Sequence, residues 1–350
     1  MGHLMSKNCE ESKMNNTSNA KLTSAEIAAL WTQYMNETAS ICIHKHMLEH
    51  IEDTEIRSVF EYAMALSHEH TRKIKEFFKS ESFPIPIGFS DNDYIPNVPR
   101  VFSDVFCLNY LNIMSIHGCN GYSGAITTCT RVDVRNYFSE CITTSVELCN
   151  QTKNLLLEKG LYLRPPVITP PDRAEYIDDK SYLTGWLGEK RPLSCIEIAD
   201  IYFNLKKSIF AKAFVVFAHQ VAKSKDVKKL LKKAVKTKEK HVRTFFEVFL
   251  AENLPNPSIF DAEITDSTNS PFSEKLIMFQ VGFLFSTAMV YYGTGWATSP
   301  RRDLSPKYMK AIADDLDIGN EWINLMIKNR WIEQPPLSED RSKLAEQKNE

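Results

Sequence analysis

Histidine is the residue type in this sequence best suited to binding a metal ion, and the chain has nine of them. A helical bundle that holds two irons needs a Glu on each of two helices and a Glu-x-x-His motif on each of the other two. None of the nine histidines has a Glu three positions earlier, and Lys238 stands there before His241. The sequence therefore lacks the usual di-iron motif, which argues against an enzyme of that kind.

Two of the histidines have the spacing that suits a different metal site. His46 and His50 lie four residues apart in a helix-forming segment, so both imidazoles share one helix face, with Glu49 and Asp53 on the same segment. This spacing predicts a Zn or Fe site whose remaining ligands come from elsewhere. The candidates for those ligands are His70, His117 and Glu147. The alternative is that these histidines are solvated and bind nothing.

Small and aromatic residues mark a second type of candidate site. Gly118, Gly121 and Gly124 recur at every third position of a helical segment, so they predict close helix packing rather than a phosphate-binding loop. Residues 291–296 read Tyr-Tyr-Gly-Thr-Gly-Trp, a pattern that could frame an apolar pocket between helices, with Tyr292 and Trp296 in its lining. Packing without a pocket is the alternative.

The elements that must position these residues occur twice. Residues 22–89 align without a gap on residues 193–260 at an offset of 171, and residues 102–166 align on 272–336 at an offset of 170. In this alignment 25 of 133 positions are identical, where composition alone would give about 8. The sequence therefore predicts a tandem duplication of one unit.

Each unit predicts four helices. In the first unit they cover about residues 24–50, 54–80, 102–125 and 133–159, and the pattern Thr23-x-x-Glu26 is a capping box ahead of the first of them. Asp133 is the expected N-cap of the fourth helix. A connection of about fifteen residues separates the second helix from the third, which suits the long crossover of ferritin-like bundles. We therefore expect an all-α protein of two tandem ferritin-like four-helix bundles.

His70 and His241 are the only histidines that the two copies share. Both lie at the inward register of an apolar stripe on the second helix of their unit. One interpretation is a core imidazole held by a hydrogen bond to a neighbouring helix. The other is the remodelled form of a metal or ligand site.

The units have expected boundaries at residues 21–164 and 193–337. Residues 1–20 and 338–350 are polar or charged and are expected to be disordered tails. Residues 165–192 are rich in proline but also carry Tyr176, Tyr182, Leu183, Trp186 and Leu187. These apolar side chains predict a strap that packs on both bundles.

Composition limits the setting and the partners. The formal net charge of -2 disfavours specific nucleic-acid binding, and eight cysteines without a C-x-x-C pair indicate a reducing, cytoplasmic setting. Residues 276–292 are apolar but are interrupted by Gln280 and Gly282, so no membrane span is required. The segment Lys223–Lys240 contains nine lysines and predicts a solvated face, with an acidic partner as the alternative.

Several motifs together resemble a known family. They are the Pro-x-Pro exits at residues 84–86 and 255–257, Ser-Tyr-Leu-Thr-Gly-Trp at 181–186, Ser-Pro-Arg-Arg-Asp at 299–303, and the Pro-Pro endings at 165–166 and 335–336. They are similar to domain-of-unknown-function family 3231 of spore-forming Gram-positive bacteria, and the resemblance covers residues 22–345. It implies tandem ferritin-like bundles and carries no assigned reaction.

Three hypotheses about function follow. The first is a non-enzymatic binding or structural protein, linked to sporulation through the bacterial setting of the family. The second is a metal-binding redox or storage protein with a non-standard site of histidines and carboxylates in the first bundle. The third is a carrier of an apolar small molecule between the helices. Because ferritin-like bundles often associate through helix faces, a homo-oligomer is expected in each case.

Overall fold

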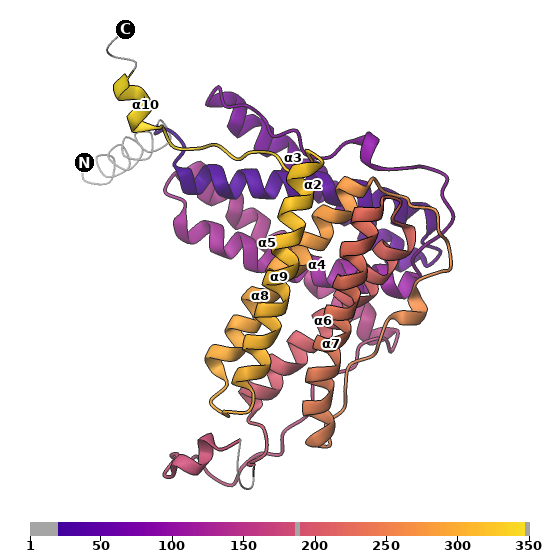
Figure 1. Cartoon of the computed structure of the whole chain (residues 1–350), viewed down its shortest axis with the longest axis vertical. Helices are drawn as coiled ribbons and strands as arrows, with labels where there is room; N and C mark the ends of the chain where they lie inside the picture. The colour runs from indigo at the N-terminus through magenta and orange to yellow at the C-terminus, as the bar shows by residue number, and fades with distance from the viewer. Residues whose placement is uncertain (1–19, 186–189, 347–350) are drawn as a thin grey trace, which may run out of the picture.

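The computed structural model describes residues 20–185 and 190–346, which are helical apart from loops and two isolated β-bridges (Figure 1). The first half contains α2 (Ser24–His50), α3 (Thr54–Ser80), α4 (Asp104–Thr128) and α5 (Val132–Glu158). The second half contains α6 (Cys195–Val221), α7 (Lys225–Ala251), α8 (Glu274–Thr298) and α9 (Ser305–Lys328). Each set of four packs as a bundle. The all-α duplicated fold is confirmed, whereas its ferritin-like character stays a prediction.

Each bundle begins at the capping box that the sequence predicts. At the start of α2, the Glu26 amide is 3.3 Å from the Thr23 hydroxyl, and the Glu26 carboxylate accepts from the Thr23 amide at 2.7 Å. At the start of α6, Ser194 and Glu197 make the same pair of contacts at 3.3 and 2.8 Å. Because both copies satisfy the same helix-end amides in this way, the first helix of each bundle starts at a matching position.

A buried arginine ties three helix ends together in each bundle. The Arg131 guanidinium contacts Glu81 at 2.5 Å and Asp133 at 2.6 Å, while its backbone amide donates to Glu26 at 2.7 Å. The second bundle repeats this network with Arg301, Glu252, Asp303 and Glu197. The expectation that Asp133 caps α5 is wrong, because Arg131 is the N-cap and Asp133 instead pairs with it.

The crossover loops after α3 and α7 pair with each other. They contain the short 3-10 helices η1 (Asp91–Asp93) and η3 (Asp261–Glu263). Tyr94 forms an isolated antiparallel β-bridge with Phe272, and Phe102 forms another with Ile264. The offset of 170 carries Tyr94 onto Ile264 and Phe102 onto Phe272, so each bridge is the symmetry mate of the other. The halves are therefore related by a pseudo-twofold axis that passes between these loops.

The two bundles lie across one another and share a core (Figure 1). Where α4 meets α6, the Phe106 and Phe210 rings stack at 5.2 Å. One apolar cluster runs from this junction through both bundles. A second, separate cluster occupies part of the first bundle and includes Leu30, Ile74 and Phe78. The core of the first bundle is therefore divided, while that of the second is continuous.

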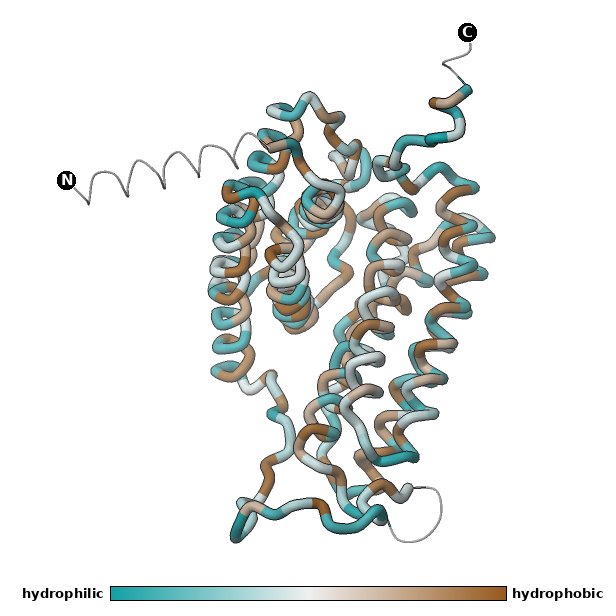
Figure 2. The backbone as a smooth tube through the Cα atoms, turned by 90° about the vertical axis from the view of Figure 1, so that its left-hand side faces the viewer, coloured by the Kyte–Doolittle hydropathy of each residue, from teal (hydrophilic) through white to brown (hydrophobic). Residues whose placement is uncertain are grey.

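The strap between the bundles packs less than the sequence predicts. It leaves the bundles as an extended loop (Figure 2), residues 171–181 are exposed, and Tyr176 is 94% exposed. Packing begins at η2 (Lys180–Leu183), where the Arg191 guanidinium covers the Tyr182 ring and the Leu183 carbonyl accepts from the Arg302 amide. Trp186 and Leu187 lie outside the described residues.

Few residues of the two predicted tails are among those that the structure describes. The N-terminal tail lies outside the described residues apart from Ala20. The predicted C-terminal tail contains a short exposed helix, α10 (Arg341–Glu346). Helix α8 is long and apolar enough to cross a membrane by length and composition, with half of that segment buried in the protein. It packs between α6 and α9, as the core helix of a bundle does.

Candidate functional site

The first bundle contains a cavity of about 1000 Å³ between α2 and α4 that extends to α8 of the second bundle. Small side chains leave this space: Ala25, Ala28 and Ala29 on α2 face Gly121 and Gly124 on α4. A Cβ atom at either glycine would meet nothing within 4 Å. The predicted close packing at Gly121 and Gly124 is therefore wrong, because these two positions open the helix pair instead of closing it.

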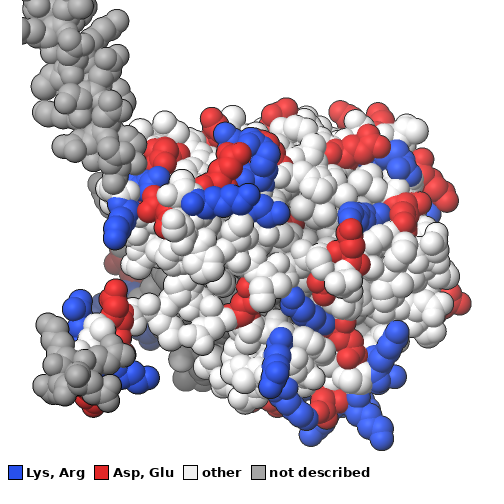
Figure 3. All heavy atoms as spheres, turned by 90° about the horizontal axis from the view of Figure 1, so that it is seen from above, with Lys and Arg blue, Asp and Glu red and all other residues white. Residues whose placement is uncertain are grey.

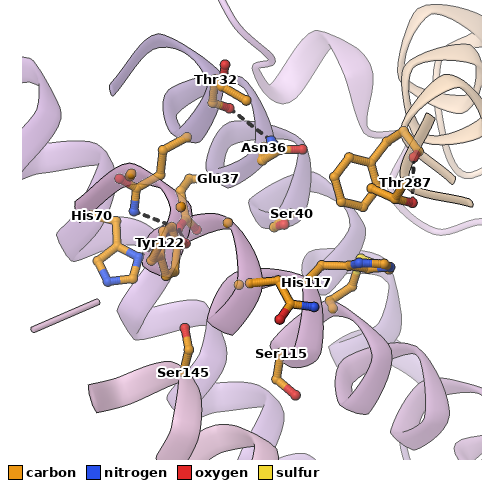
Figure 4. Close-up of a pocket in the computed structure, with 18 of the residues that line it drawn as sticks. Thr32, Asn36, Glu37, Ser40, His70, Ser115, His117, Tyr122, Ser145 and Thr287 are labelled. Atoms are coloured by element: carbon orange, nitrogen blue, oxygen red, sulfur yellow. Dashed lines mark hydrogen bonds and ion pairs between the residues drawn. The ribbon is translucent and has the colours of Figure 1, made fainter. Parts of the chain in front are cut away.

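Three helices of the first bundle bring a polar cluster to the cavity wall (Figure 4). One Glu37 oxygen accepts from His70 Nδ1 at 2.7 Å and from the Tyr122 hydroxyl at 2.7 Å. The Gln33 amide, one turn earlier on α2, is 3.4 Å from the same oxygen. Glu37 is buried, and through these hydrogen bonds it joins α2, α3 and α4.

The cluster is an ion pair at neutral pH. Burial alone would raise the pKa of Glu37, but His70 and the hydrogen bonds hold it at about 2. Burial alone would lower the pKa of His70, but the Glu37 carboxylate raises it to about 10. Burial lowers the pKa of the other two lining histidines, to about 4 for His44 and about 3 for His117. The described lining therefore carries one positive and one negative charge, which cancel.

A second polar group faces the cavity from the junction of the bundles. His117 on α4 stacks on Tyr291 of α8, and its Nδ1 lies 2.9 Å from the Tyr291 hydroxyl. The Asn120 amide donates to the same hydroxyl at 2.9 Å. Figure 4 shows His117 across the cavity from Glu37 and His70. The cavity thus has polar groups at two places and an apolar lining between them.

The corresponding space in the second bundle is filled. Lys238 stands at the position of Ser67, Asp315 at that of Ser145 and Phe285 at that of Ser115. Lys238 Nζ lies 2.9 and 2.8 Å from the two Asp315 oxygens and 3.8 Å from the centre of the Phe285 ring. Both charged residues are fully buried, and the void beside them measures about 10 Å³. The same helix arrangement therefore exists with and without a large cavity.

His241 has different partners from His70. Ser208 replaces Glu37, and the Tyr292 hydroxyl bridges Ser208 at 2.7 Å and His241 Nδ1 at 3.2 Å. Burial, helped by Lys238, lowers the pKa of His241 to about 3. His70 is therefore charged at neutral pH and His241 is neutral, although both stand at one position of the repeat. Both have the hydrogen bond to a neighbouring helix that a core imidazole needs.

The predicted metal candidates do not meet at one place. Among the described residues, ligand atoms of His46, Glu49 and His50 lie within 4.8 Å of one another, near the end of α2 and outside the cavity lining. His70 and His117 line the cavity. Glu147 is exposed and accepts from the Tyr62 hydroxyl at 3.0 Å.

The predicted pocket residues lie outside the cavity lining. Tyr292 is fully buried in the filled second bundle. Trp296 is 46% exposed and donates to the Ser305 hydroxyl at 2.6 Å. Their neighbour Tyr291, one helical position away, is the residue of that motif that faces the cavity. A one-residue change of helix register, about 100°, explains the difference.

Lys233, Lys238 and Lys240 of the lysine-rich segment pair with acidic residues of the same chain. Lys233 contacts Asp317 and Glu321 at 2.6 and 2.5 Å, and Lys240 contacts Asp314 at 2.7 Å. Lys238 of the same segment is in the core. Figure 3 shows a face where basic and acidic side chains alternate with uncharged areas. The prediction of an acidic partner at Lys223–Lys240 gains no support from these contacts.

Comparisons with known proteins place the chain in a family. No curated protein matches the sequence. The solved crystal structure of a candidate spore coat protein from Bacillus halodurans C-125 is similar, with 18% identity and a TM-score of 0.40. That match covers 44% of this chain and 99% of the other. The family model described as "Protein of unknown function (DUF3231)" matches residues 11–173 and again residues 181–344. The chain therefore belongs to this family and contains its unit twice, in tandem.

Proposed function

We propose that this protein binds an uncharged, largely apolar small molecule in the cavity of the first bundle. The observation that carries the proposal is the cavity itself, about 1000 Å³ in the first bundle, at a place that the second bundle fills. Because the second bundle keeps the same four helices with this space closed, the fold does not require the cavity. Its volume is at the upper end of the range for small-molecule sites.

The charges of the lining support an uncharged ligand. Glu37 and His70 neutralise each other at 2.7 Å, and the described lining residues include no other charged group at neutral pH. A charged ligand would lose its hydration without gaining a free counter-charge, which is costly in an apolar site. A neutral molecule with one or two hydrogen-bonding groups fits the polar clusters around Glu37 and His117.

The same pKa values support binding rather than acid-base catalysis. An efficient general acid or base has a pKa close to the working pH. The pKa of Glu37 is about 2 and that of His70 is about 10, so neither exchanges a proton readily near pH 7. The cluster therefore supports a role in holding the helices and orienting a bound molecule.

The test is to fill the cavity with the side chains that the second bundle uses. Ser115→Phe copies Phe285, and Gly121→Tyr copies Tyr291. Titration with an uncharged naphthylamine dye, whose fluorescence rises in apolar surroundings, should show one saturable site in the original protein. Each variant should bind the dye at least about tenfold more weakly, because the added ring occupies the site.

Ser139→Phe is the matched control, because Ser139 is exposed on α5 and does not line the cavity. This control should bind the dye as the original protein does. A sulfonated, anionic analogue of the dye should bind weakly to all of them. Equal binding of the uncharged dye to the original protein and to both cavity variants would contradict the proposal. If the predicted pattern of dye binding is found, mass spectrometry of molecules that co-purify with the original protein would identify the natural ligand.

A link to sporulation is a separate part of this proposal. It rests on the setting that the family resemblance implies, spore-forming bacteria. Following the amount of the protein through spore formation tests it, and a constant level in growing and sporulating cells would contradict it.

A further inference from the structure

His46 occupies a position where the second half of the chain has a phenylalanine. Phe217, its counterpart, packs on Phe102 at 4.6 Å and on Phe272 at 6.3 Å. By the pseudo-twofold symmetry, His46 packs on Phe272 at 5.6 Å and on Phe102 at 6.2 Å. His46 is 1% exposed, and its Nδ1 is buried without a hydrogen-bond partner. Since a phenylalanine meets the packing requirement without an unpaired nitrogen, packing does not explain this imidazole.

His50 lies one helical turn beyond His46, and a hydrogen bond to the crossover loop orients its ring. Its Nε2 is 2.9 Å from the Val98 carbonyl oxygen in the crossover loop. A carbonyl oxygen can only accept, so Nε2 carries the hydrogen and Nδ1 is left with a free lone pair. Histidines that bind metals are typically held in this way, with the second ring nitrogen donating to a carbonyl or carboxylate.

Glu49 supplies a carboxylate between the two histidines. Its counterpart in the second half, Gln220, donates to the carbonyls of Thr265 and Ser267 at 2.9 and 2.6 Å and so anchors the other crossover loop. Glu49 cannot donate in this way when ionised, and its side chain is exposed at the mouth of the cluster. The Tyr94 hydroxyl comes from the loop beside it, and burial together with the neighbouring Glu49 carboxylate raises the pKa of Tyr94.

The geometry points to a binding site for one divalent transition-metal ion of the Zn²⁺ type, formed by His46, Glu49 and His50. Their ligand atoms already lie within 4.8 Å of one another, and two imidazoles with one carboxylate form a typical three-ligand zinc set. The second half has Phe217, Gln220 and Val221 at these positions, so the site occurs once in the duplication.

The bound ion would fix the end of helix α2, which lies against the crossover loop. His50 already contacts that loop through Val98, and Tyr94 of the loop pairs with Phe272 of the other half. The ion therefore would stabilise the junction at the pseudo-twofold axis. This proposal is independent of the cavity, because none of the three ligands lines it.

The test uses the full-length chain, stripped of metal, with Zn²⁺ and Co²⁺ as probes. Calorimetry should show one strong Zn²⁺ site, and Co²⁺ should give the visible absorption bands of a low-symmetry site with nitrogen ligands. The variants copy the second half: His46→Phe, Glu49→Gln and His50→Val. Each should weaken Zn²⁺ binding by about 100-fold or more, because each removes a direct ligand.

Two of these variants should keep the fold, so a loss of Zn²⁺ binding in them reports the loss of a ligand. Glu49 is exposed, so Glu49→Gln leaves the fold intact, and His46→Phe should keep or raise the melting temperature of the metal-free protein. His68→Ala is the matched control, since His68 is exposed on α3 and outside the cluster. Its affinity for Zn²⁺ should equal that of the original protein. The proposal is overturned if calorimetry shows no saturable Zn²⁺ site in the original protein. It is also overturned if His46→Phe and Glu49→Gln bind Zn²⁺ with unchanged affinity.

Discussion

The interiors of the two bundles differ although their helices are arranged in the same way. Both place a histidine at the same inner position of the second helix and a tyrosine at the same position of the third. Around them the first bundle has Glu37 and small residues and keeps a large cavity, while the second has a buried lysine and aspartate and keeps almost none. The comparison teaches that the interior of this helix arrangement can change its chemistry without a change of fold.

The largest effect is expected from breaking the ion pair that fills the second bundle. Lys238→Ala leaves Asp315 buried without a counter-charge, which should lower the free energy of unfolding by about 3–5 kcal/mol. Urea denaturation measures this. Replacing the partly exposed Lys233 by Ala is the control and should cost only about 0.2–1 kcal/mol.

A double variant sharpens this comparison. Lys238→Ser with Asp315→Ser copies Ser67 and Ser145 of the first bundle and removes both charges together. It should be more stable than Lys238→Ala and should create a second site for the uncharged dye. If the single and double variants were equally unstable, the ion pair would not be the element that closes the second bundle.

A smaller effect is expected from removing the carboxylate of the first bundle. Glu37→Gln loses a charge-assisted hydrogen bond to His70 and should cost about 2 kcal/mol in urea denaturation at pH 7. The raised pKa of His70, about 10, adds stability that is complete below about pH 6.5 and is lost as the pH rises toward 10. Glu37→Gln should abolish this alkaline loss. A variant that kept it would show that another group titrates.

His241 makes the second bundle sensitive to acid, as the buried His44 and His117 do for the first. His241 has a pKa of about 3 in the folded protein, below its ordinary value of 6.5, so the unfolded chain takes up its proton first. Stability should therefore fall as the pH drops from about 6.5 toward 3. Ring resonances of the two histidines, followed by NMR, should show His70 protonated at pH 8 and His241 neutral at pH 5. If both rings titrated with the same pKa, the difference between His70 and His241 would be contradicted.

The smallest effect concerns the helix that lines the cavity. Gly121→Ala adds a methyl group that meets nothing within 4 Å and should stabilise the protein by about 0.5–1 kcal/mol through helix propensity. The melting temperature measures this gain, and dye binding should hardly change. The same substitution at Gly295 of α8 should destabilise, because a Cβ there would lie 2.7 Å from the Tyr308 ring. If Gly121→Ala destabilised the protein as Gly295→Ala does, the space beside Gly121 would be closed in solution.

The sequence predicts much of this fold because its signals are local. The repeat offsets, the capping boxes at Thr23 and Ser194 and the crossover lengths each depend on neighbouring residues, and the helices follow them closely. His46 and His50 were identified as a pair for the same reason, since four residues make one helical turn. Glu49 lies on the same helix, three residues after His46, so the same spacing places its carboxylate near both histidines.

The sequence predicts an apolar pocket between helices but not the place of this cavity, because the cavity consists of missing volume. Ser115 and Gly121 suggest tight packing as readily as open space, and only the distance between α2 and α4 decides between them. The available signal was the second copy, which has Phe285 and Tyr291 at these two positions. Glu37 was missed although it interrupts an apolar helix, because its partners His70 and Tyr122 come from other helices.

The pairing of the crossover loops has a consequence for how the chain is made. Ser103 at the start of α4 donates its amide to Glu263, and Ser273 at the start of α8 donates to Asp93. During synthesis the ribosome delivers the N-terminal half first, and the Ser103 amide gains its partner only after Glu263 has emerged. After the duplication, each half therefore supplies backbone contacts that complete the crossover loop of the other.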